Sequence, residues 1–498
     1  MSGIHVGCMQ SEPSPSAVPH LNRELGLWDT TMIVAGSMIG SGIFIVPSDL
    51  ARQVGGSGWM LALWVFTGLL TIAAALSYGE LAAMMPKAGG QYVYLREAFG
   101  PLTGFLYGWT LFLVIQTGTI AAVAVAFARF LGVLWPQVSE GHKWVQFGRF
   151  GISPMQLVAC VVVCLLTWSN STGLRAGKYV QNVFTGTKIL ALAALIVAGI
   201  TLGWNANVVR ANFSAPWHAE SEGAVLSGLG LMVVLGTAMV GTLFSSDAWN
   251  NVTFVAGEVR NPSRTLPASL VLGVVLVSVL YFLANVSYLV TLPVTGDAAG
   301  TTALARGIQH AQFDRVGTAA VEVILGPSGR SAIAALIMVS TFGCINGLVF
   351  AGARVYYAMA KDRLFFERVG GLNSKGVPAV GLWVQCVWAC LLTLSGSYGD
   401  LLDYVIFAVL IFYVLTIAGL FVLRRTQPQA ERPYRAWGYP LLPACYIVFA
   451  SLIAIDLLIA PKTRANAWPG LFLVLAGIPV YYFWKRGACA RASTSAGS

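Results

Sequence analysis

The chain has 498 residues, of which 57% are hydrophobic and only 10% are charged, and its mean hydropathy is +0.73. Soluble globular chains carry about 25% charged residues, so these values exclude a soluble protein and predict an all-α polytopic membrane protein. The net charge of +10 requires no nucleic acid as a partner, because anionic lipid at the cytoplasmic face of a bilayer accounts for it.

Apolar stretches long enough to cross a bilayer, about 20 residues each, recur along the chain. They predict twelve membrane-spanning helices, at about residues 28–50, 58–84, 101–134, 154–171, 179–202, 225–255, 267–292, 331–358, 379–396, 401–423, 440–460 and 467–484. The segment 293–330 is predicted to be a long loop that holds short helices. Residues 1–24 and 487–498 are expected to be disordered tails, which leaves residues 25–486 as a single transmembrane domain.

Lys and Arg residues predict the orientation. If the N-terminus is cytoplasmic, about two thirds of the 30 Lys and Arg residues fall on the cytoplasmic side, as the positive-inside rule requires. We therefore expect both termini in the cytoplasm, and a location in the plasma membrane, with a bacterial inner membrane as the expected case.

A glycine pair interrupts the first predicted span. Gly40 and Gly42 flank Ser41, and glycine strongly weakens a helix. At bilayer depth, unwound backbone is tolerated where it is covered by protein or lines a cavity. Its freed N–H and C=O groups suit a small zwitterion. The alternative is an uninterrupted helix whose small residues allow close packing against a neighbour.

A second interruption lies in the sixth span, within residues 241–250 (GTLFSSDAWN). It carries Asp247, and a carboxylate at membrane depth is a functional hypothesis by default. Interruptions in the first and sixth spans are expected from two five-span halves of opposite topology, here about 28–202 and 225–423, followed by two added helices at 440–484. The alternative is a carboxylate near the interface that faces water or an arginine.

Lys188 lies within the fifth span, roughly 13 Å from its cytoplasmic end at 1.5 Å per residue. An ammonium group at this depth needs backbone carbonyls or a carboxylate as partner. It could fill a cation site permanently, or lose its proton and couple transport to protons. The alternative is a side chain that extends toward the interface.

Five strings in the chain together resemble the L-type amino acid transporter family of the amino acid–polyamine–organocation superfamily. They are residues 40–44 (GSGIF), 85–94 (MPKAGGQYVY), 180–188 (VQNVFTGTK), 249–254 (WNNVTF) with 258–262 (EVRNP), and 342–347 (FGCING). They occur in family order, and the resemblance covers about residues 25–440. It implies a sodium-symporter-type fold, a 5+5 inverted repeat with discontinuous helices 1 and 6.

The resemblance also implies roles for particular residues. The N–H groups of Ser41, Gly42 and Ile43 would hold the substrate carboxylate. The carbonyls of Met38 or Ile39, and those of Phe244 and Asp247, would take the substrate ammonium. Phe244 would also be an aromatic gate, Asn250 would shape the site, Lys188 would replace a sodium ion, and Tyr288 would join the Lys188 network.

Two departures from the family pattern bear on function. Ser246-Asp247-Ala248 stands where many relatives have Tyr-Asp-Gly or Tyr-Gly-Gly, so an aromatic wall is lost and Ala248 narrows the break. The outer loop at 134–153 has no cysteine, whereas light chains of animal heteromers carry one there. We therefore expect a stand-alone, prokaryotic transporter without a covalently attached heavy chain.

No cofactor and no metal site is expected, because the five histidines show no ligand spacing. Cys160 and Cys164 lie four residues apart but have no His or carboxylate nearby in the sequence.

The favoured function is sodium-independent exchange of L-amino acids. The alternatives are a proton-coupled amino acid symporter and a membrane receptor that binds an amino acid without transport. An intramembrane enzyme is disfavoured by the lack of paired catalytic groups at depth.

Overall fold

The computed structural model describes residues 23–138, 145–147, 150–221, 224–395 and 398–495. Most of the predicted N-terminal tail, and the last three residues of the C-terminal one, lie outside the described residues. Within the described part, eleven helical segments are long and apolar enough to cross a membrane, and one shorter apolar helix, Ala379–Ser395, accompanies them. The prediction of an all-α polytopic membrane protein is confirmed, whereas the count of twelve spans stays a prediction.

Helices dominate because a chain in lipid must satisfy its backbone N–H and C=O groups internally. The α-helices are α1 (Leu27–Met38), α2 (Gly42–Val54), α3 (Ser57–Met84), α4 (Gln91–Phe99), α5 (Pro101–Thr110), α6 (Gln116–Leu134), α7 (Pro154–Ser171), α8 (Leu174–Thr201), α9 (Ala206–Ser214), α10 (Gly228–Ser245), α11 (Asn251–Phe254), α12 (Pro262–Thr291), α13 (Ala303–Arg306), α14 (Val316–Lys361), α15 (Ala379–Ser395), α16 (Tyr398–Thr426), α17 (Leu441–Ile459) and α18 (Arg464–Ser495).

Short elements complete the list. One π-helical turn, η1 (Leu111–Ile115), joins α5 to α6, and the 3₁₀ turns are η2 (Pro136–Val138), η3 (Ala256–Glu258), η4 (Gln312–Asp314) and η5 (Glu367–Gly370). Two small antiparallel hairpins pair β1 (Val145–Phe147) with β2 (Phe150–Ile152), and β3 (Glu220–Ser221) with β4 (Ala224–Val225).

The segment α14 is two helices joined at Gly326, whose φ of +72° is not helical and which precedes Pro327. The part before Gly326 is a short helix within the predicted loop 293–330, and the part after it contains the predicted eighth span. The predicted C-terminal tail is wrong, because α18 continues to Ser495 through most of that segment.

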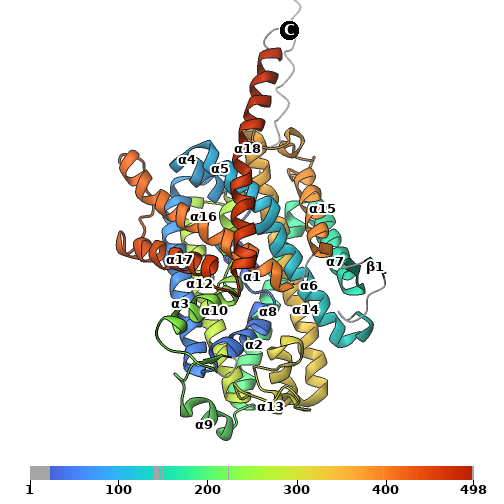
Figure 1. The fold of residues 1–498 in the computed structure, drawn as a ribbon. Coiled ribbons are helices and arrows are strands. Elements are labelled where there is room, and N and C mark those ends of the chain that lie inside the picture. Colours follow the sequence, from blue (N-terminus) through green and yellow to red (C-terminus); the bar gives the residue numbers. More distant parts are fainter. Residues whose placement is uncertain (1–22, 139–144, 148–149, 222–223, 396–397, 496–498) are drawn as a thin grey trace, which may run out of the picture.

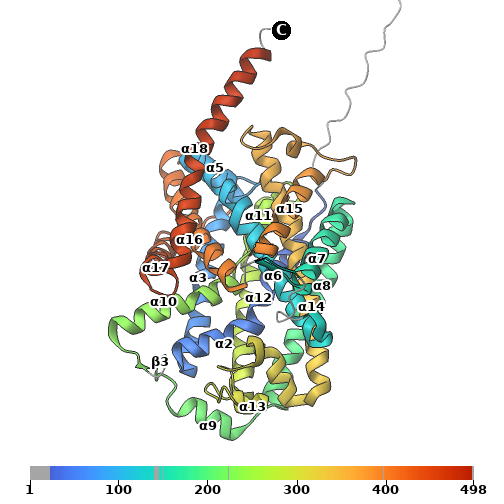
Figure 2. The same ribbon diagram turned by 45° about the vertical axis from the view of Figure 1, so that its right-hand side comes forward.

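The helices form one bundle with distinct ends (Figures 1 and 2). Helices α9 and α13, from two loops predicted to face the same side of the membrane, lie together at one end. The end of α18 projects from the opposite end. The loops that hold α9 and α13 therefore lie at one end of the bundle, as expected for two loops predicted to face the same side of the membrane.

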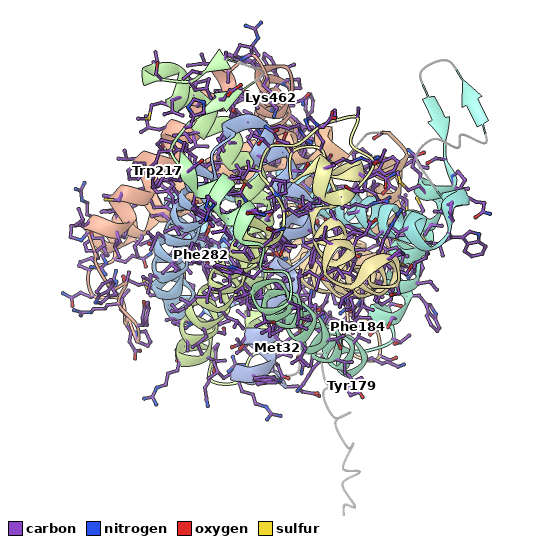
Figure 3. The ribbon with its side chains drawn as sticks, turned by 90° about the horizontal axis from the view of Figure 1, so that it is seen from below. Met32, Tyr179, Phe184, Trp217, Phe282 and Lys462 are labelled. Atoms are coloured by element: carbon purple, nitrogen blue, oxygen red, sulfur yellow. The ribbon has the colours of Figure 1, made fainter. Side chains whose placement is uncertain are left out.

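The first span lies in the core of the bundle. Every residue of α1 from Thr30 to Met38 is buried, and α1 packs on α8, α12 and α14. Seen from the end that carries α9 and α13, Met32 of α1 lies near Phe184 and Tyr179 of α8 (Figure 3). Gly36 permits this approach, because a Cβ there would lie 2.1 Å from the side-chain nitrogen of Gln181 on α8.

Candidate functional site

The first predicted break is present. Helix α1 ends at Met38 and α2 begins at Gly42, and between them Ile39 has extended backbone angles (φ −74°, ψ 94°). The last carbonyls of α1 and the first N–H groups of α2 therefore lack partners within their own helices. The helix dipoles add partial negative charge at the end of α1 and partial positive charge at the start of α2.

The second predicted break is also present. Helix α10 ends at Ser245 and α11 begins at Asn251. Ala248 lies between them with φ +63°, a left-handed conformation that costs a residue with a side chain about 1 kcal/mol or more. Glycine would adopt this conformation without penalty, so the Cβ of Ala248 keeps the turn under strain.

The two breaks contact each other. The Cα of Gly42 faces α10 so closely that a Cβ there would lie 2.1 Å from the Ser245 Oγ. Tyr281 of α12, which is buried, has its hydroxyl 3.0 Å from the Met38 carbonyl and 3.1 Å from the Ser245 carbonyl. One tyrosine thus lies within hydrogen-bonding distance of the carbonyl at the end of each broken half-helix.

Lys188 fills the space beside the first break. Its side chain is 1% exposed, and its Nζ donates to the carbonyls of Gly36 (2.5 Å), Ile39 (2.8 Å) and, more weakly, Ser340 of α14 (3.3 Å). The prediction that the ammonium needs backbone carbonyls or a carboxylate is confirmed, with carbonyls as the partners. A side chain that extends to the interface is excluded by this burial.

Helix α14 binds further carbonyls of the same turn. The Cys344 Sγ lies 3.0 Å from the Ser37 carbonyl, and the Ser340 hydroxyl lies 3.4 Å from that of Ile39. Side chains of α8 and α14, together with Tyr281 of α12, therefore satisfy the acceptors that the end of α1 leaves open. The strings that carried the family resemblance in these helices meet at this point.

Asp247 is buried, and its Oδ1 accepts a 2.6 Å hydrogen bond from the Tyr413 hydroxyl of α16. Within the described part of the chain, Asp247 has no ion-pair partner, so the alternative of an arginine neighbour is not supported. It lines two cavities of about 10 and 20 Å³, each with room for about one water molecule. Neither cavity has room for an amino acid.

The remaining span-six residues are placed as follows. The Asn250 side-chain nitrogen donates to Gln91 of α4 at 2.8 Å, and Gln91 donates in turn to Thr416 of α16 at 3.0 Å. The carbonyl of Phe244, predicted to take the substrate ammonium, accepts the N–H of Asp247 at 3.2 Å. Asn250 lines one of the two cavities, but residues 38–43 and Phe244 line neither.

Tyr288 lies apart from the Lys188 network. Its hydroxyl is buried and has no hydrogen-bond partner among the described residues, and Gly317 lies next to it. The span-seven tyrosine at the breaks is Tyr281, seven residues earlier. Tyr281, Tyr413 and Gln91 were all missed from the sequence, although each is a polar group within or beside an apolar segment.

A buried ion pair lies beyond the second break. Arg354 of α14 and Glu258 of η3 are 1% and 2% exposed at their side chains, with Nη2 and Oε1 3.1 Å apart. The carbonyl of Glu258 also accepts the N–H groups of Glu24 and Leu25 at 2.9 and 3.0 Å. Arg354 is buried, whereas Lys361, Arg363 and Arg368 are exposed.

Comparison with known proteins shows which family the chain belongs to. The model of a family described as amino acid permease matches residues 25–482. The chain belongs to the amino acid permease family. It is 28% identical to the mouse b(0,+)-type amino acid transporter 1 over 480 residues, which are 95% of this chain and 91% of the relative. It is 30% identical to the rabbit protein of the same name over 467 residues, 93% and 88% of the two chains. It is 29% identical to the human large neutral amino acids transporter small subunit 2 over 501 residues, 97% and 85%.

As an amino acid permease, the chain is a secondary amino acid transporter and not an enzyme. The permease family and the apolar helices together make it a multi-pass membrane protein. The predicted membership of the L-type transporter family is confirmed by these relatives.

Proposed function

We propose that this permease exchanges L-amino acids across the plasma membrane without sodium, by alternating access, with both termini in the cytoplasm. The observation that carries the proposal is the ammonium of Lys188, held by the carbonyls of Gly36, Ile39 and Ser340. Such a cluster of carbonyls from α1 and α14 is what would otherwise hold a metal cation. A lysine that bonds to these carbonyls makes a sodium ion unnecessary there.

The substrate would bind between the two breaks. The N–H groups of Ser41, Gly42 and Ile43 would hold its carboxylate, which the positive end of the α2 dipole favours. The carbonyls of Met38 or Ile39, Phe244 and Asp247 would take its ammonium group. This assignment is supported by the contact between Gly42 and Ser245, which brings the two breaks together.

Two further residues would shape this site. Phe244 would close over the substrate. Asn250 would fix the position of Gln91 beside the site, because its side-chain nitrogen donates a 2.8 Å hydrogen bond to the Gln91 side chain. The carboxylate of Asp247 would favour neutral amino acids with some tolerance of cationic ones. The absence of a cysteine from residues 134–153 supports a permease that works without a covalently attached partner chain.

The test uses purified protein in proteoliposomes loaded with unlabelled amino acid. Uptake of labelled amino acid should be unchanged when choline replaces sodium, and Lys188→Ala should lose most of it. Lys178→Ala is the matched control, because Lys178 lies on the same helix and pairs with Asp29 at the partly exposed end. A steep requirement for sodium in the parent protein would contradict the proposal.

Proton symport is the second candidate, since the hydrogen bonds of Lys188 go to three neutral carbonyls and a neutral amine could keep part of this arrangement. An imposed pH gradient would then drive uptake into empty proteoliposomes, which an exchanger does not do. A receptor without transport would bind amino acids and show no uptake in either experiment.

A further inference from the structure

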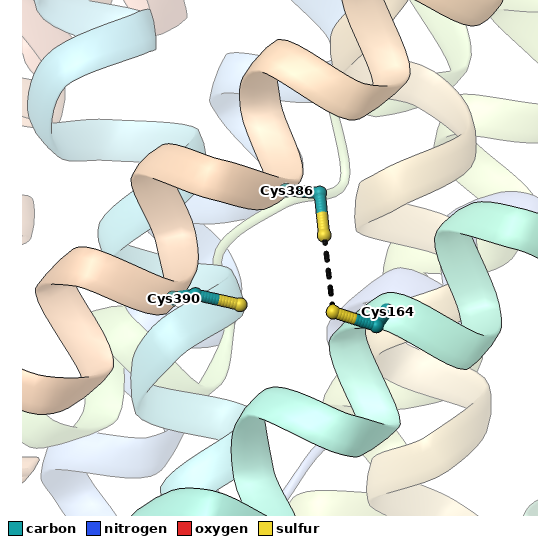
Figure 4. Close-up of side chains that lie close together, drawn as sticks. All are labelled: Cys164, Cys386 and Cys390. Atoms are coloured by element: carbon teal, nitrogen blue, oxygen red, sulfur yellow. Dashed lines mark hydrogen bonds between the residues drawn. The ribbon is translucent and has the colours of Figure 1, made fainter.

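Four cysteines lie together between two helices that are far apart in the sequence. Cys160 and Cys164 are one turn apart on α7, and Cys386 and Cys390 are one turn apart on α15. All four are near the middle of their helices. Figure 4 shows Cys386 and Cys390 directed from α15 toward Cys164 on α7. The support that Cys160 and Cys164 lack in the sequence thus comes from α15.

The sulfur atoms have the spacing of a metal–thiolate site. The Sγ atoms of Cys164 and Cys386 are 3.7 Å apart, and those of Cys164, Cys386 and Cys390 all lie within 4.8 Å of one another. Sulfurs bound to one zinc ion at about 2.3 Å in tetrahedral geometry are about 3.8 Å apart. One edge of such a site is therefore already formed, and small side-chain rotations bring in the third sulfur.

Cys160 is turned differently. Its Sγ lies 3.8 Å from the Cys390 carbonyl, and the Cys390 Sγ lies 3.9 Å from the Cys160 carbonyl. These contacts join α7 to α15 but leave Cys160 outside the three-sulfur group. Cys160 is therefore the natural control for Cys164, with the same residue type on the same helix one turn away.

The surroundings of the cluster are apolar. Val161 and Leu165 beside it on α7, and Val387 and Leu391 on α15, are all more than half exposed on the surface of the bundle, as expected where helices face hydrocarbon. A net charge is costly there. A divalent cation lowers the charge of three thiolates from −3 to −1, and its binding needs no oxidant.

We propose that Cys164, Cys386 and Cys390 bind one thiophilic divalent cation of the zinc class. All three thiols lose their protons to solvent when the ion binds, because the thiolate is the form of cysteine that binds metal. Soft sulfur ligands select such ions over Mg²⁺ and Ca²⁺. The bound ion would join α7 to α15. This site is separate from the proposed substrate site, so the two proposals stand or fall independently.

The test uses Cd²⁺, whose bond to thiolate sulfur absorbs in the near ultraviolet. The full-length protein carries Cys8→Ser, Cys445→Ser and Cys489→Ser, so that three cysteines outside the cluster do not bind the probe. It is reduced, freed of reductant without air, and titrated with Cd²⁺. We expect one equivalent bound, three protons released per ion, and competition by Zn²⁺ but not by Mg²⁺.

Single variants assign the ligands. Cys164→Ser and Cys386→Ser should each weaken Cd²⁺ binding at least tenfold, whereas Cys160→Ser should bind as the parent does. Thermal unfolding gives a second readout, because a ligand that binds only the folded state raises its stability, so Cd²⁺ should raise the melting temperature of the parent and not that of Cys164→Ser. Unchanged binding in both ligand variants would overturn the proposal.

Discussion

Gly42 and Ser245 pack so closely that a Cβ on Gly42 would lie 2.1 Å from the Ser245 Oγ and 3.0 Å from the Ser245 Cα. A Cβ there would also lie 2.8 Å from the Ser245 Cβ, closer than real Cβ atoms approach their neighbours, so any side chain at the start of α2 forces Ser245 or the α2 backbone to shift. The glycine is therefore required by the packing of one break on the other, in addition to any role of its N–H group toward a substrate.

Gly42→Val should abolish uptake while the protein still inserts into the membrane, because the valine forces the two breaks apart. Gly40→Ala is the matched control: its Cβ would lie 3.3 Å from the Cys344 Sγ and 3.9 Å from the Val123 Cγ2, with no closer contact, and we expect most uptake to remain. Transport assays on both variants, with surface expression measured in parallel, check this. Near-normal uptake by a well-expressed Gly42→Val protein would remove the substrate site from the first break.

Tyr281→Phe should lower uptake of every substrate and destabilise the protein by about 1 kcal/mol, the usual net worth of one hydrogen bond. The reason is that the Tyr281 hydroxyl lies within hydrogen-bonding distance of the carbonyls of Met38 and Ser245. Tyr288→Phe should be close to neutral, since that hydroxyl is buried without a partner among the described residues. Transport rates and thermal unfolding of the two variants, compared side by side, measure the difference. A larger loss of uptake and stability for Tyr288→Phe than for Tyr281→Phe would mean that Tyr288 takes part in the Lys188 network after all.

Sequence reasoning found both breaks because glycine pairs and a buried carboxylate are local signals. It could not separate Tyr281 from Tyr288, because residues seven apart lie on the same face of a helix and only tertiary contacts distinguish them. For Lys188 the kind of partner could be predicted, since a buried ammonium needs acceptors. The particular carbonyls could not, because they depend on how α8 and α14 pack against α1.

The cysteine cluster shows the same limit. Cys164 and Cys386 are 222 residues apart in the chain, and each pair alone resembles small apolar residues in a span. Their meeting depends on the packing of α7 on α15, which no local pattern encodes. Short-range patterns thus predicted elements and interruptions, whereas every contact between spans required the structure.

Asp247→Asn should weaken substrate binding about ten- to a hundred-fold, because loss of a charge-assisted hydrogen bond in a desolvated site costs about 1.5–3 kcal/mol. An equal loss for alanine and arginine would mean that the carboxylate acts on the common ammonium group. A loss confined to arginine would mean that it pairs with a cationic side chain. Binding measured by thermal shift for both ligands distinguishes these roles.

Tyr413→Phe is the companion variant. It removes the 2.6 Å hydrogen bond to the Asp247 carboxylate and leaves the charge in place, so we expect a smaller loss of affinity than for Asp247→Asn. If the Asn variant binds both amino acids as tightly as the parent does, Asp247 is not part of the substrate site.

The fourth prediction concerns the Glu258–Arg354 ion pair, whose two side chains are almost fully buried. Removal of one partner leaves an uncompensated buried charge, which typically costs about 3–5 kcal/mol. We therefore expect Arg354→Met to destabilise the permease strongly. The loss should extend to the N-terminal segment, since the Glu258 carbonyl accepts the N–H groups of Glu24 and Leu25.

The double variant Glu258→Gln/Arg354→Met should recover most of that stability, because replacing a whole buried pair by neutral groups is often nearly neutral. Arg368→Met, on the exposed segment after α14, is the control and should change the free energy of unfolding by no more than about 0.5 kcal/mol. Unfolding in detergent of the parent, Glu258→Gln, Arg354→Met and the double variant, analysed as a double-mutant cycle, gives the coupling between the two residues. A coupling below about 0.5 kcal/mol would mean that the two side chains do not form a buried pair in the membrane protein.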